Sequence, residues 1–549
     1  MKLNLYKQKN TFFLIFFYFT AFILTFLILE DFGIHIEEKF HRLNGHFWLN
    51  YISDVFGFEY LKQVTETKMS SIFDYTLNRP SYFNRYGIVL DLPAALIEIV
   101  FNIDDVKTIY YLKHFLSFLI FLISSFFFYK IILKRYDSFF LSIIGLILYL
   151  TTPRIFGDSF LYKDVLYLSF FTISLYFFFQ SIDKLNYKNL LLLALFSSLS
   201  VNLRIFSLLI PIIFIFLIIV KNFFKKNLVE DTKKLIFYLI FFIVCLYMFW
   251  PYLWSDPLKN FLDLFRYLTR DLIDVKIFYG GDYISNRIIP DIYIFNWIFI
   301  SSPLILSGLS FFGILSYFYR LLRRYTKIKT ELIYNDLWRS TKEEKDFIIL
   351  IFFITFFMLF LLLNAPLYNG WRLLYFFNIF FIYFAINFLY FLKISLRKRN
   401  IFKATYFIIS LAAVFYNLLS IFLTHPYQSI YFNSILNSKI INNYEGDYHG
   451  IASKDFFEKI LEIDDKENFI IAVASHTPIQ RGLEALPKKL SQKFNIVGQN
   501  YILADYIFKN NISEVNSNLI KKYEVPKNFS KIYTKKKGKL IIYEIYERD

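Results

Sequence analysis

The chain has 549 residues, of which 56% are hydrophobic and 22% aromatic, and its formal net charge is +17 at pH 7. Long uncharged apolar runs at this frequency exclude an ordinary soluble globular protein. The basic excess is typical of cytoplasmic loops in membrane proteins, so we do not interpret it as a nucleic-acid surface, and the single cysteine, Cys245, excludes an internal disulfide or a cysteine-ligated metal site.

Apolar runs along the chain predict about eleven membrane-spanning helices. The first run, 11–29, contains 19 residues without a charge, and a helix of that length can cross a bilayer at about 1.5 Å per residue. It is too long for a typical signal-peptide core and has no small-residue cleavage site, so we interpret it as an uncleaved anchor. The other ten runs lie near 111–129, 138–152, 165–181, 189–203, 205–220, 235–252, 292–317, 347–364, 373–391 and 404–424.

Lysine and arginine follow every even-numbered run, and three lysines precede the first. The positive-inside rule therefore places the amino terminus in the cytoplasm. With an odd number of spans, the carboxyl terminus lies on the outer side of the cell (inner) membrane. The first outer loop is then 30–110, within which 90–101 is predicted to be a helix lying in the membrane interface.

The tail has a different composition from the rest of the chain. Its apolar segments are short and alternate with polar ones, so 468–474 and 539–545 are predicted strands and 478–494 a predicted helix. We divide the chain into a membrane domain, 1–437, and a small extracytoplasmic α/β domain, 438–549.

Carboxylates gather directly after the first span. Asp31, Glu37 and Glu38 fall within eight residues, and acidic residues at a membrane surface are costly unless they have a task. Transfer of a sugar to a hydroxyl requires a general base, which a carboxylate can provide. The alternative is a solvated acidic loop that helps to set the topology.

The loop at 152–164, between the third and fourth runs, carries two cations and two acids. Arg154 and Lys163 can hold a phosphate leaving group, and Asp158 or Asp164 can orient sugar hydroxyls or a metal. The alternative is a connecting loop with local ion pairs, which contribute little.

Two further arginines stand at membrane boundaries. Arg204 interrupts an apolar stretch, where a charge faces either a partner or the outer surface. Arg372 follows Tyr368 and Trp371, a setting that suits a lipid phosphate or a sugar ring, or an anchor in an aromatic belt. His41 and His425 lack the spacing of a metal motif and are interpreted as packed or surface residues.

The order of these features resembles the GT-C superfamily of integral-membrane glycosyltransferases, and within it the bacterial family 39-like proteins, which include protein O-mannosyltransferases and the lipid A aminoarabinose transferase. The blocks that carry the resemblance are Ile36-Glu37-Glu38, Pro153–Gly157 with Lys163-Asp164, Gly370-Trp371-Arg372, His425-Pro426-Tyr427 with Tyr431-Phe432-Asn433, and Gly446–Gly450. The family usually has Asp-Glu in the first loop, where this chain has Glu37-Glu38.

The resemblance implies an inverting transfer from a polyprenyl-phosphate sugar to a protein hydroxyl, a glycan or an envelope lipid. Glu37 is the expected base with Glu38 as its neighbour, and Asp31 is the alternative base. Lys163, Arg204 and Arg372 are expected to contact the lipid phosphate. Some members use a divalent metal and others do not, so no cofactor is certain and the metal stays open.

Three other functions are compatible with a polytopic chain. A flippase or transporter for a lipid-linked oligosaccharide would place charges within its spans, often in repeated halves. A polysaccharide polymerase or ligase would carry its main outer loop in mid-chain. A scaffold without activity is the third alternative.

Overall fold

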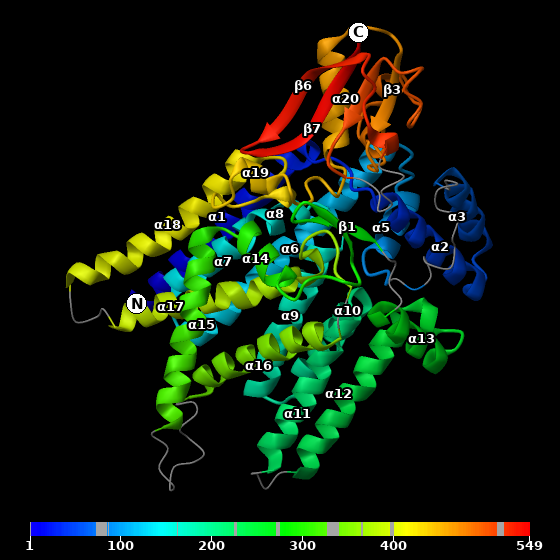
Figure 1. Ribbon diagram of the computed structural model, residues 1–549. Helices are drawn as coiled ribbons and strands as arrows, with labels where there is room; N and C mark the ends of the chain where they lie inside the picture. Colours follow the sequence, from blue (N-terminus) through cyan, green and yellow to red (C-terminus); the bar gives the residue numbers. More distant parts are fainter. Residues whose placement is uncertain are drawn as a thin grey trace.

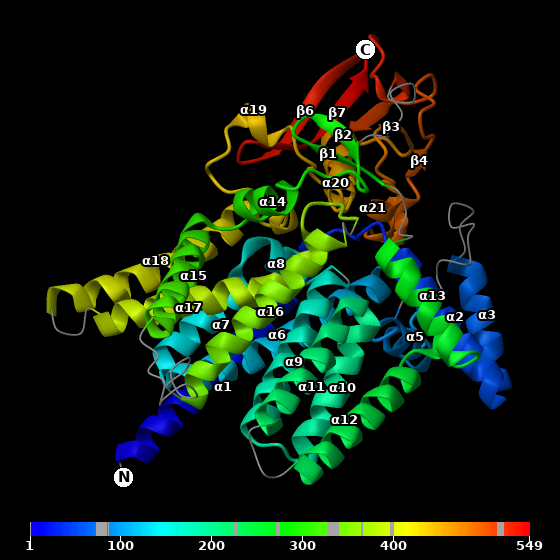
Figure 2. The ribbon, with the colours of Figure 1, turned by 60° about the horizontal axis from the view of Figure 1, so that its bottom comes forward.

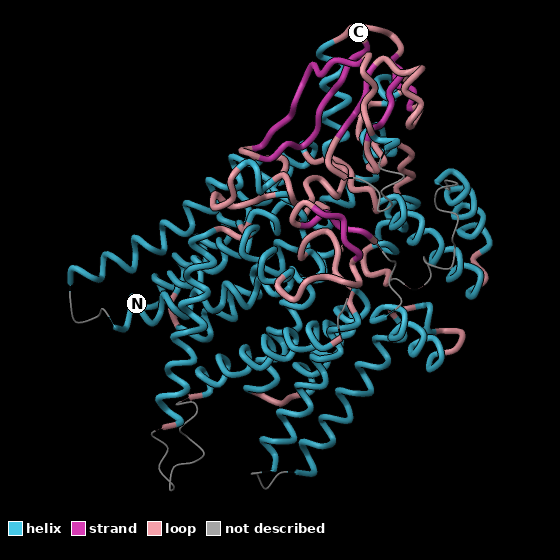
Figure 3. Tube along the Cα trace, viewed as in Figure 1, coloured by secondary structure: helices cyan, strands magenta, loops and turns pink. Residues whose placement is uncertain are grey.

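The computed structural model describes residues 2–549 apart from 73–84, 86, 162, 224–227, 271–274, 327–339, 364–365, 396–399 and 513–520. Figure 1 shows a body of long helices with a small β-sheet unit at one end, where the chain also ends. Among the described residues, Figure 3 shows strands in this unit and in one short hairpin, β1 (Lys276–Tyr279) and β2 (Asp282–Ser285).

Seven helical segments are long and apolar enough to cross a membrane, judged by length and composition. They are α1 (Lys2–Ile28), α6 (Val106–Tyr136), α9 (Asp164–Asp183), α15 (Leu304–Tyr325), α16 (Thr341–Leu362), the 3-10 segment η5 (Arg372–Phe377) continued by α17 (Asn378–Ser395), and α18 (Asn400–Thr424). The chain is thus an integral membrane protein. The direction in which these helices cross the membrane stays a prediction from charge.

The predicted number of about eleven spans is corrected to seven candidates among the described residues. The other four runs are helical, but the helices are shorter or carry more charge: α7 (Phe139–Thr151), α10 (Tyr187–Leu203), α11 (Leu209–Phe223) and α12 (Leu228–Met248). Figure 2 shows α9, α10, α11 and α12 running side by side. The run 292–317 is broken at Pro303 into α14 (Tyr293–Ser301) and α15, because proline has no N–H and disfavours a helical residue before it.

The first loop folds into helices beside the membrane body. They are α2 (Glu38–Phe56), α3 (Glu59–Ile72) and α5 (Asp91–Val100), and α13 (Pro257–Arg270) lies at the same side of the molecule (Figures 1 and 2). The predicted helix at 90–101 is confirmed as α5. Its buried Glu98 accepts two hydrogen bonds from Arg42 of α2, at 3.0 and 2.6 Å, which fixes α5 to α2.

A buried ion cluster joins four helices away from the sheet unit. Asp346 of α16 accepts hydrogen bonds from Arg135 of α6 at 2.7 and 2.6 Å, from Arg320 of α15 at 3.0 Å and from Tyr383 of α17 at 2.7 Å. Asp346 and Arg135 are both buried. A bidentate guanidinium–carboxylate pair has fixed geometry, so Asp346 sets how these helices pack.

We expect Asp346→Asn to lower the free energy of unfolding by about 3–5 kcal/mol, since it leaves Arg135 buried without a counter-charge. Thermal unfolding in detergent measures this loss. The matched control is Lys342→Gln, which breaks a solvent-exposed pair with Asp137 of 3.6 Å and should change nothing measurable. A wild-type melting temperature for Asp346→Asn would contradict a structural role for the cluster.

The tail forms a five-stranded sheet in the order β4-β3-β5-β7-β6. The strands are β3 (Phe469–Ala474), β4 (Phe494–Ile496), β5 (Tyr506–Lys509), β6 (Phe529–Lys537) and β7 (Leu540–Arg548). The β3–β4 and β3–β5 pairs are parallel, and the β5–β7 and β6–β7 pairs are antiparallel. The helix α20 (Ala452–Ile463) packs on the sheet through Phe456 and Tyr543, whose rings lie 6.0 Å apart.

Two of the three elements predicted in the tail are confirmed. The strands at 468–474 and 539–545 are β3 and most of β7. The single helix predicted at 478–494 is wrong: α21 (Gln480–Glu484) and α22 (Lys488–Ser491) are separate turns, and Phe494 begins β4. Pro487, directly before α22, ends the first turn because it cannot donate a helical hydrogen bond.

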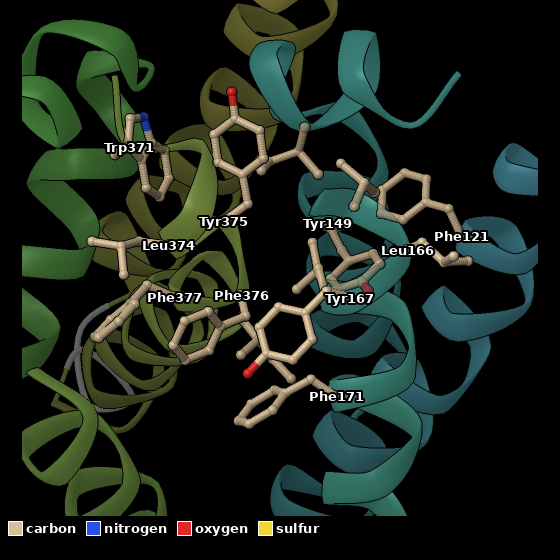
Figure 4. Packing of buried hydrophobic residues seen from close by; sticks show 14 of the residues in the cluster. Phe121, Tyr149, Leu166, Tyr167, Phe171, Trp371, Leu374, Tyr375, Phe376 and Phe377 are labelled. Atoms are coloured by element: carbon tan, nitrogen blue, oxygen red, sulfur yellow. The ribbon is translucent and has the colours of Figure 1, made fainter. Parts of the chain in front are cut away.

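The segment η5 is held in place by a dense aromatic core. Figure 4 shows Phe376 beside Tyr167 and Phe171 of α9, whereas Tyr375 points to the opposite side from Phe376. The ring centroid of Phe376 lies 5.2 Å from that of Tyr167 and 5.2 Å from that of Phe171. Aromatic pairs at this distance add to the stabilisation from burial. The packing of η5 therefore fixes the position of its first residue, Arg372.

Candidate active site

Arg372 lies at the centre of a group of charges contributed by distant parts of the chain. Its Nη2 donates to Glu37 Oε1 at 2.6 Å, its Nη1 lies 3.2 Å from His35 Nε2, and its Nε lies 3.6 Å from Asp164 Oδ2. The guanidinium is 2% exposed. A buried guanidinium needs carboxylate partners, and here it joins the first loop to the start of α9.

Two more predicted cations stand next to this group. Arg204, directly after α10, donates to Asp164, the first residue of α9. Lys163 precedes Asp164 with φ at +96°, an uncommon conformation for a lysine. Glu37, Lys163, Asp164, Arg204 and Arg372 are called the cation cluster below. Its members all lie at or beside the ends of helices.

The charge of Glu37 is set by its neighbours. Burial acts to raise the pKa of its carboxyl, but the Arg372 guanidinium, His35 and Lys163 outweigh this and hold the pKa well below its usual range. The side chain of Glu37 is 38% exposed, whereas Arg372 beneath it is buried. Glu37 is thus an ionised carboxylate at the surface of the cluster, and it can accept a proton from a group that approaches from outside.

Lys163, unlike Glu37, has surroundings that favour its uncharged form. Burial and the nearby Arg204 lower the pKa of its ammonium to about 7, although Glu37 and Asp164 act to raise it. Its positive charge therefore disappears within the physiological range of pH.

We expect the affinity for a lipid phosphodiester to fall up to about tenfold between roughly pH 6 and pH 8, as Lys163 loses its proton. The phosphodiester of such a lipid does not titrate in this range, so the change belongs to the protein. Lys163→Arg should bind the lipid equally at both pH values, because arginine stays charged. Binding measured at both pH values tests this, and an equal fall in the arginine variant would contradict the assignment.

Behind the cation cluster lie Arg154 and Asp158 on the short helix α8 (Pro153–Asp158). Arg154 is fully buried; its Nε donates to the Tyr431 carbonyl at 2.8 Å, and its guanidinium lies 5.2 Å from the ring of Trp297. Asp158 Oδ2 is 3.4 Å from His449 Nε2. Burial, together with the neighbouring Asp164, raises the pKa of Asp158 to about 8 despite the proximity of Tyr375.

Two histidines that the sequence analysis did not select connect these groups. The rings of His35 and His449 lie 4.2 Å apart, with His35 against Arg372 and His449 against Asp158. Burial and surrounding cations hold the pKa of both well below the usual range, so both rings are neutral. His449 lies inside the block Gly446–Gly450 and His35 directly precedes Ile36-Glu37-Glu38, and this is the signal that could have identified them.

Glu38 faces away from its neighbour Glu37. Its Oε1 accepts the His35 backbone N–H and a contact from His114 Nε2, each at 2.8 Å. The carboxyl is fully buried, and His114 and Lys113 lower its pKa against the effect of burial. Glu38 is therefore placed to fix the loop that carries His35 and Glu37, rather than to meet a substrate beside Arg372.

Asp31 lies outside the cation cluster. Its Oδ2 is 2.8 Å from His425 Nε2, and its side chain is 50% exposed. With Lys454, Asp455 and Glu458 it lines a polar hollow between the first loop and the tail. The structure thus separates the two candidate bases, since Glu37 contacts Arg372 and Asp31 does not.

No group of three or more His, Cys, Asp and Glu side chains is placed to hold a metal ion within the part of the chain that the structure describes. Asp158 and His449 approach each other without a third such side chain. The residues of the cation cluster do not fit a metal centre, because three of its five members are cations.

No protein-family model and no curated protein matches the chain. Two crystal structures of the Archaeoglobus fulgidus oligosaccharyltransferase are similar to it. The apo form matches with 12% identity and a TM-score of 0.45, over 84% of this chain and 66% of the archaeal one. The complex with Zn and sulfate matches with 13% identity and a TM-score of 0.43, over 84% and 64%. The chain therefore spans just under two thirds of the length of these structures.

Proposed function

We propose that this protein is a membrane glycosyltransferase of the GT-C type, which moves a sugar from a polyprenyl-phosphate donor to a hydroxyl of a protein, glycan or envelope lipid. The observation that carries the proposal is the half-exposed carboxylate of Glu37, held at 2.6 Å on the buried Arg372. Lys163 and Arg204 stand beside this pair. A carboxylate next to cations at the end of a helix supports a general base beside a phosphate-binding site.

Arg372, Lys163, Arg204 and Glu37 each have a chemical role in this reaction. Arg372, Lys163 and Arg204 bind the phosphate of the donor and stabilise the negative charge that grows on it as the bond to the anomeric carbon breaks. Glu37 takes the proton of the acceptor hydroxyl while the oxygen attacks the anomeric carbon from the opposite face. The products are the glycosylated acceptor with inverted configuration and free polyprenyl phosphate.

The ion pair between Glu37 and Arg372 also couples the basicity of Glu37 to donor binding. In the free enzyme the guanidinium keeps Glu37 ionised but weakly basic. When a donor phosphate accepts hydrogen bonds from Arg372, the guanidinium stabilises the ionised form of Glu37 less, and the basicity of Glu37 rises. Glu37 thus becomes an effective base only when the donor is bound.

A flippase for a lipid-linked sugar is the rival that the cluster fits least well. Charges that serve transport are expected at the middle of the membrane, whereas Asp164 and Arg372 begin helical segments and Arg204 directly follows one. A polymerase or ligase would share the donor chemistry and differ in the acceptor.

Purified protein supplied with radiolabelled polyprenyl-phosphate sugars in detergent, without a bilayer, separates transferase from flippase. Crude envelope extract supplies the acceptor. We expect the donor to be consumed and the label to move to the extract. An intact donor in detergent, combined with movement of the same lipid across the bilayer of proteoliposomes, would favour the flippase instead.

A further inference from the structure

A second set of polar side chains lies directly behind the cation cluster, and this set is here called the inner polar cluster. Its members come from three separate segments and are at most 5% exposed: Arg154, Asp158, Tyr375, Glu445, Tyr448 and His449. Three of them belong to the segment that leads into the tail. The tail thereby contributes side chains to the membrane body and does not simply follow it.

Several polar atoms of this cluster have no hydrogen-bond partner within the described part of the chain. They are Nη1 and Nη2 of Arg154, Oδ1 of Asp158, Oε2 of Glu445, both ring nitrogens of His449 and the hydroxyls of Tyr375 and Tyr448. Buried polar atoms in native proteins are normally paired, so each exception requires an explanation. Eight such atoms in one place indicate that the cluster is built for a polar group from outside the chain.

The atoms comprise both donors and acceptors. Arg154 offers N–H groups, whereas Asp158 and Glu445 offer carboxyl oxygens. A hydroxyl group both donates and accepts a hydrogen bond, so a ligand with several hydroxyls can pair with all of them. The guanidinium is also near both carboxyl groups, so donors and acceptors stand side by side, as a ligand with several hydroxyls requires.

The position of the cluster indicates which part of a substrate reaches it. The His449 ring lies against the His35 ring, with centroids 4.2 Å apart, and His35 contacts Arg372 at 3.2 Å. A lipid phosphate bound to Arg372 would therefore have its attached sugar next to His449. The rings of Trp297 and Phe432 cover Arg154 at 5.2 and 4.8 Å, and ligand sites commonly combine aromatic walls with a few polar groups.

We infer that Arg154, Asp158, Glu445 and His449 bind the sugar of the donor through its hydroxyl groups, and that the segment around 445–449 completes the active site. The ligand class is a neutral hexose or pentose with free hydroxyls, attached to a polyprenyl phosphate. The inference rests on the proposed function, because it assumes a donor phosphate at Arg372.

Two binding probes separate the sugar site from the phosphate site. The first is polyprenyl phosphate alone, and the second is a panel of polyprenyl-phosphate hexoses and pentoses. The full-length protein in detergent is compared with Glu445→Gln and Asp158→Asn, which keep the shape of each side chain. Glu467→Gln, at an exposed position in the tail, is the control.

We expect the affinity of both variants for the preferred sugar lipid to fall about tenfold, the factor that corresponds to one lost hydrogen bond in a buried site. Binding of bare polyprenyl phosphate should stay within about twofold of wild type, which also shows that the variants are folded. The control should bind both probes as wild type does.

If both variants keep the wild-type preference for the sugar lipid over the bare lipid, the inference is overturned while the proposed function stands. If the variants lose affinity for both probes equally, the cluster has no sugar-specific role and the inference is likewise overturned. If the wild type binds neither probe, the proposed function itself fails and the inference fails with it.

Discussion

We expect Glu37→Gln to lower the rate of the proposed sugar transfer by about 10²–10⁴-fold in a protein that still folds, the usual contribution of a general base. The amide keeps the shape of the side chain and can still accept a hydrogen bond from Arg372, but it cannot take a proton. The measurement is release of polyprenyl phosphate by the purified variant at saturating donor. Donor binding should be retained, because the phosphate contacts come from the cations.

Asp31→Asn is the matched control for this experiment. Asp31 is another solvent-exposed carboxylate of the same loop, but it pairs with His425 and not with the cation cluster. Its removal should leave turnover within about a factor of two of wild type, as expected for a half-exposed pair. Loss of turnover in Asp31→Asn with normal activity in Glu37→Gln would reverse the assignment of the base.

Arg372→Met should have the second-largest effect, lowering kcat/KM by about 10²–10³-fold. Methionine fills a similar volume but provides neither the charge that stabilises the departing phosphate nor the hydrogen bond to Glu37 at 2.6 Å. Both donor affinity and turnover should decline, which distinguishes this variant from Glu37→Gln. Binding and turnover measured side by side test this expectation.

Arg372→Lys provides the control for charge alone. Lysine keeps the positive charge but lacks the planar fork that reaches Glu37, His35 and Asp164 from one group. We expect it to recover donor affinity in part while turnover stays low. Wild-type kcat/KM in Arg372→Met would show that the phosphate binds elsewhere.

The helices could be predicted from the sequence because a membrane span is a local property. Twenty apolar residues form a helix in lipid whatever the rest of the chain does, so all eleven runs are helical. Length and charge within each helix were harder to judge, and only seven qualify as candidate spans among the described residues. The error at 478–494 has another cause, since apolar spacing there reflects short turns and a strand that pack on the sheet.

The candidate site was predictable only in part. Charges at the ends of spans, such as Lys163, Arg204 and Arg372, stand out from their apolar surroundings, and the structure brings them together. Contacts between distant segments leave no such local mark: Arg372 and His35 are separated by 337 positions in the chain. The position of His449 beside Asp158 likewise depends on the tail folding back onto α8, which no pattern in the sequence specifies.

The most direct test of the central claim is release of free polyprenyl phosphate from a panel of polyprenyl-phosphate sugars by the purified protein, with envelope extract as the source of acceptor. We expect the wild type and Asp31→Asn to consume at least one donor and Glu37→Gln to consume none. Consumption of the same donor by Glu37→Gln at the wild-type rate, or no consumption by a folded wild type that has been given acceptor, would contradict a glycosyltransferase built on Glu37 and Arg372.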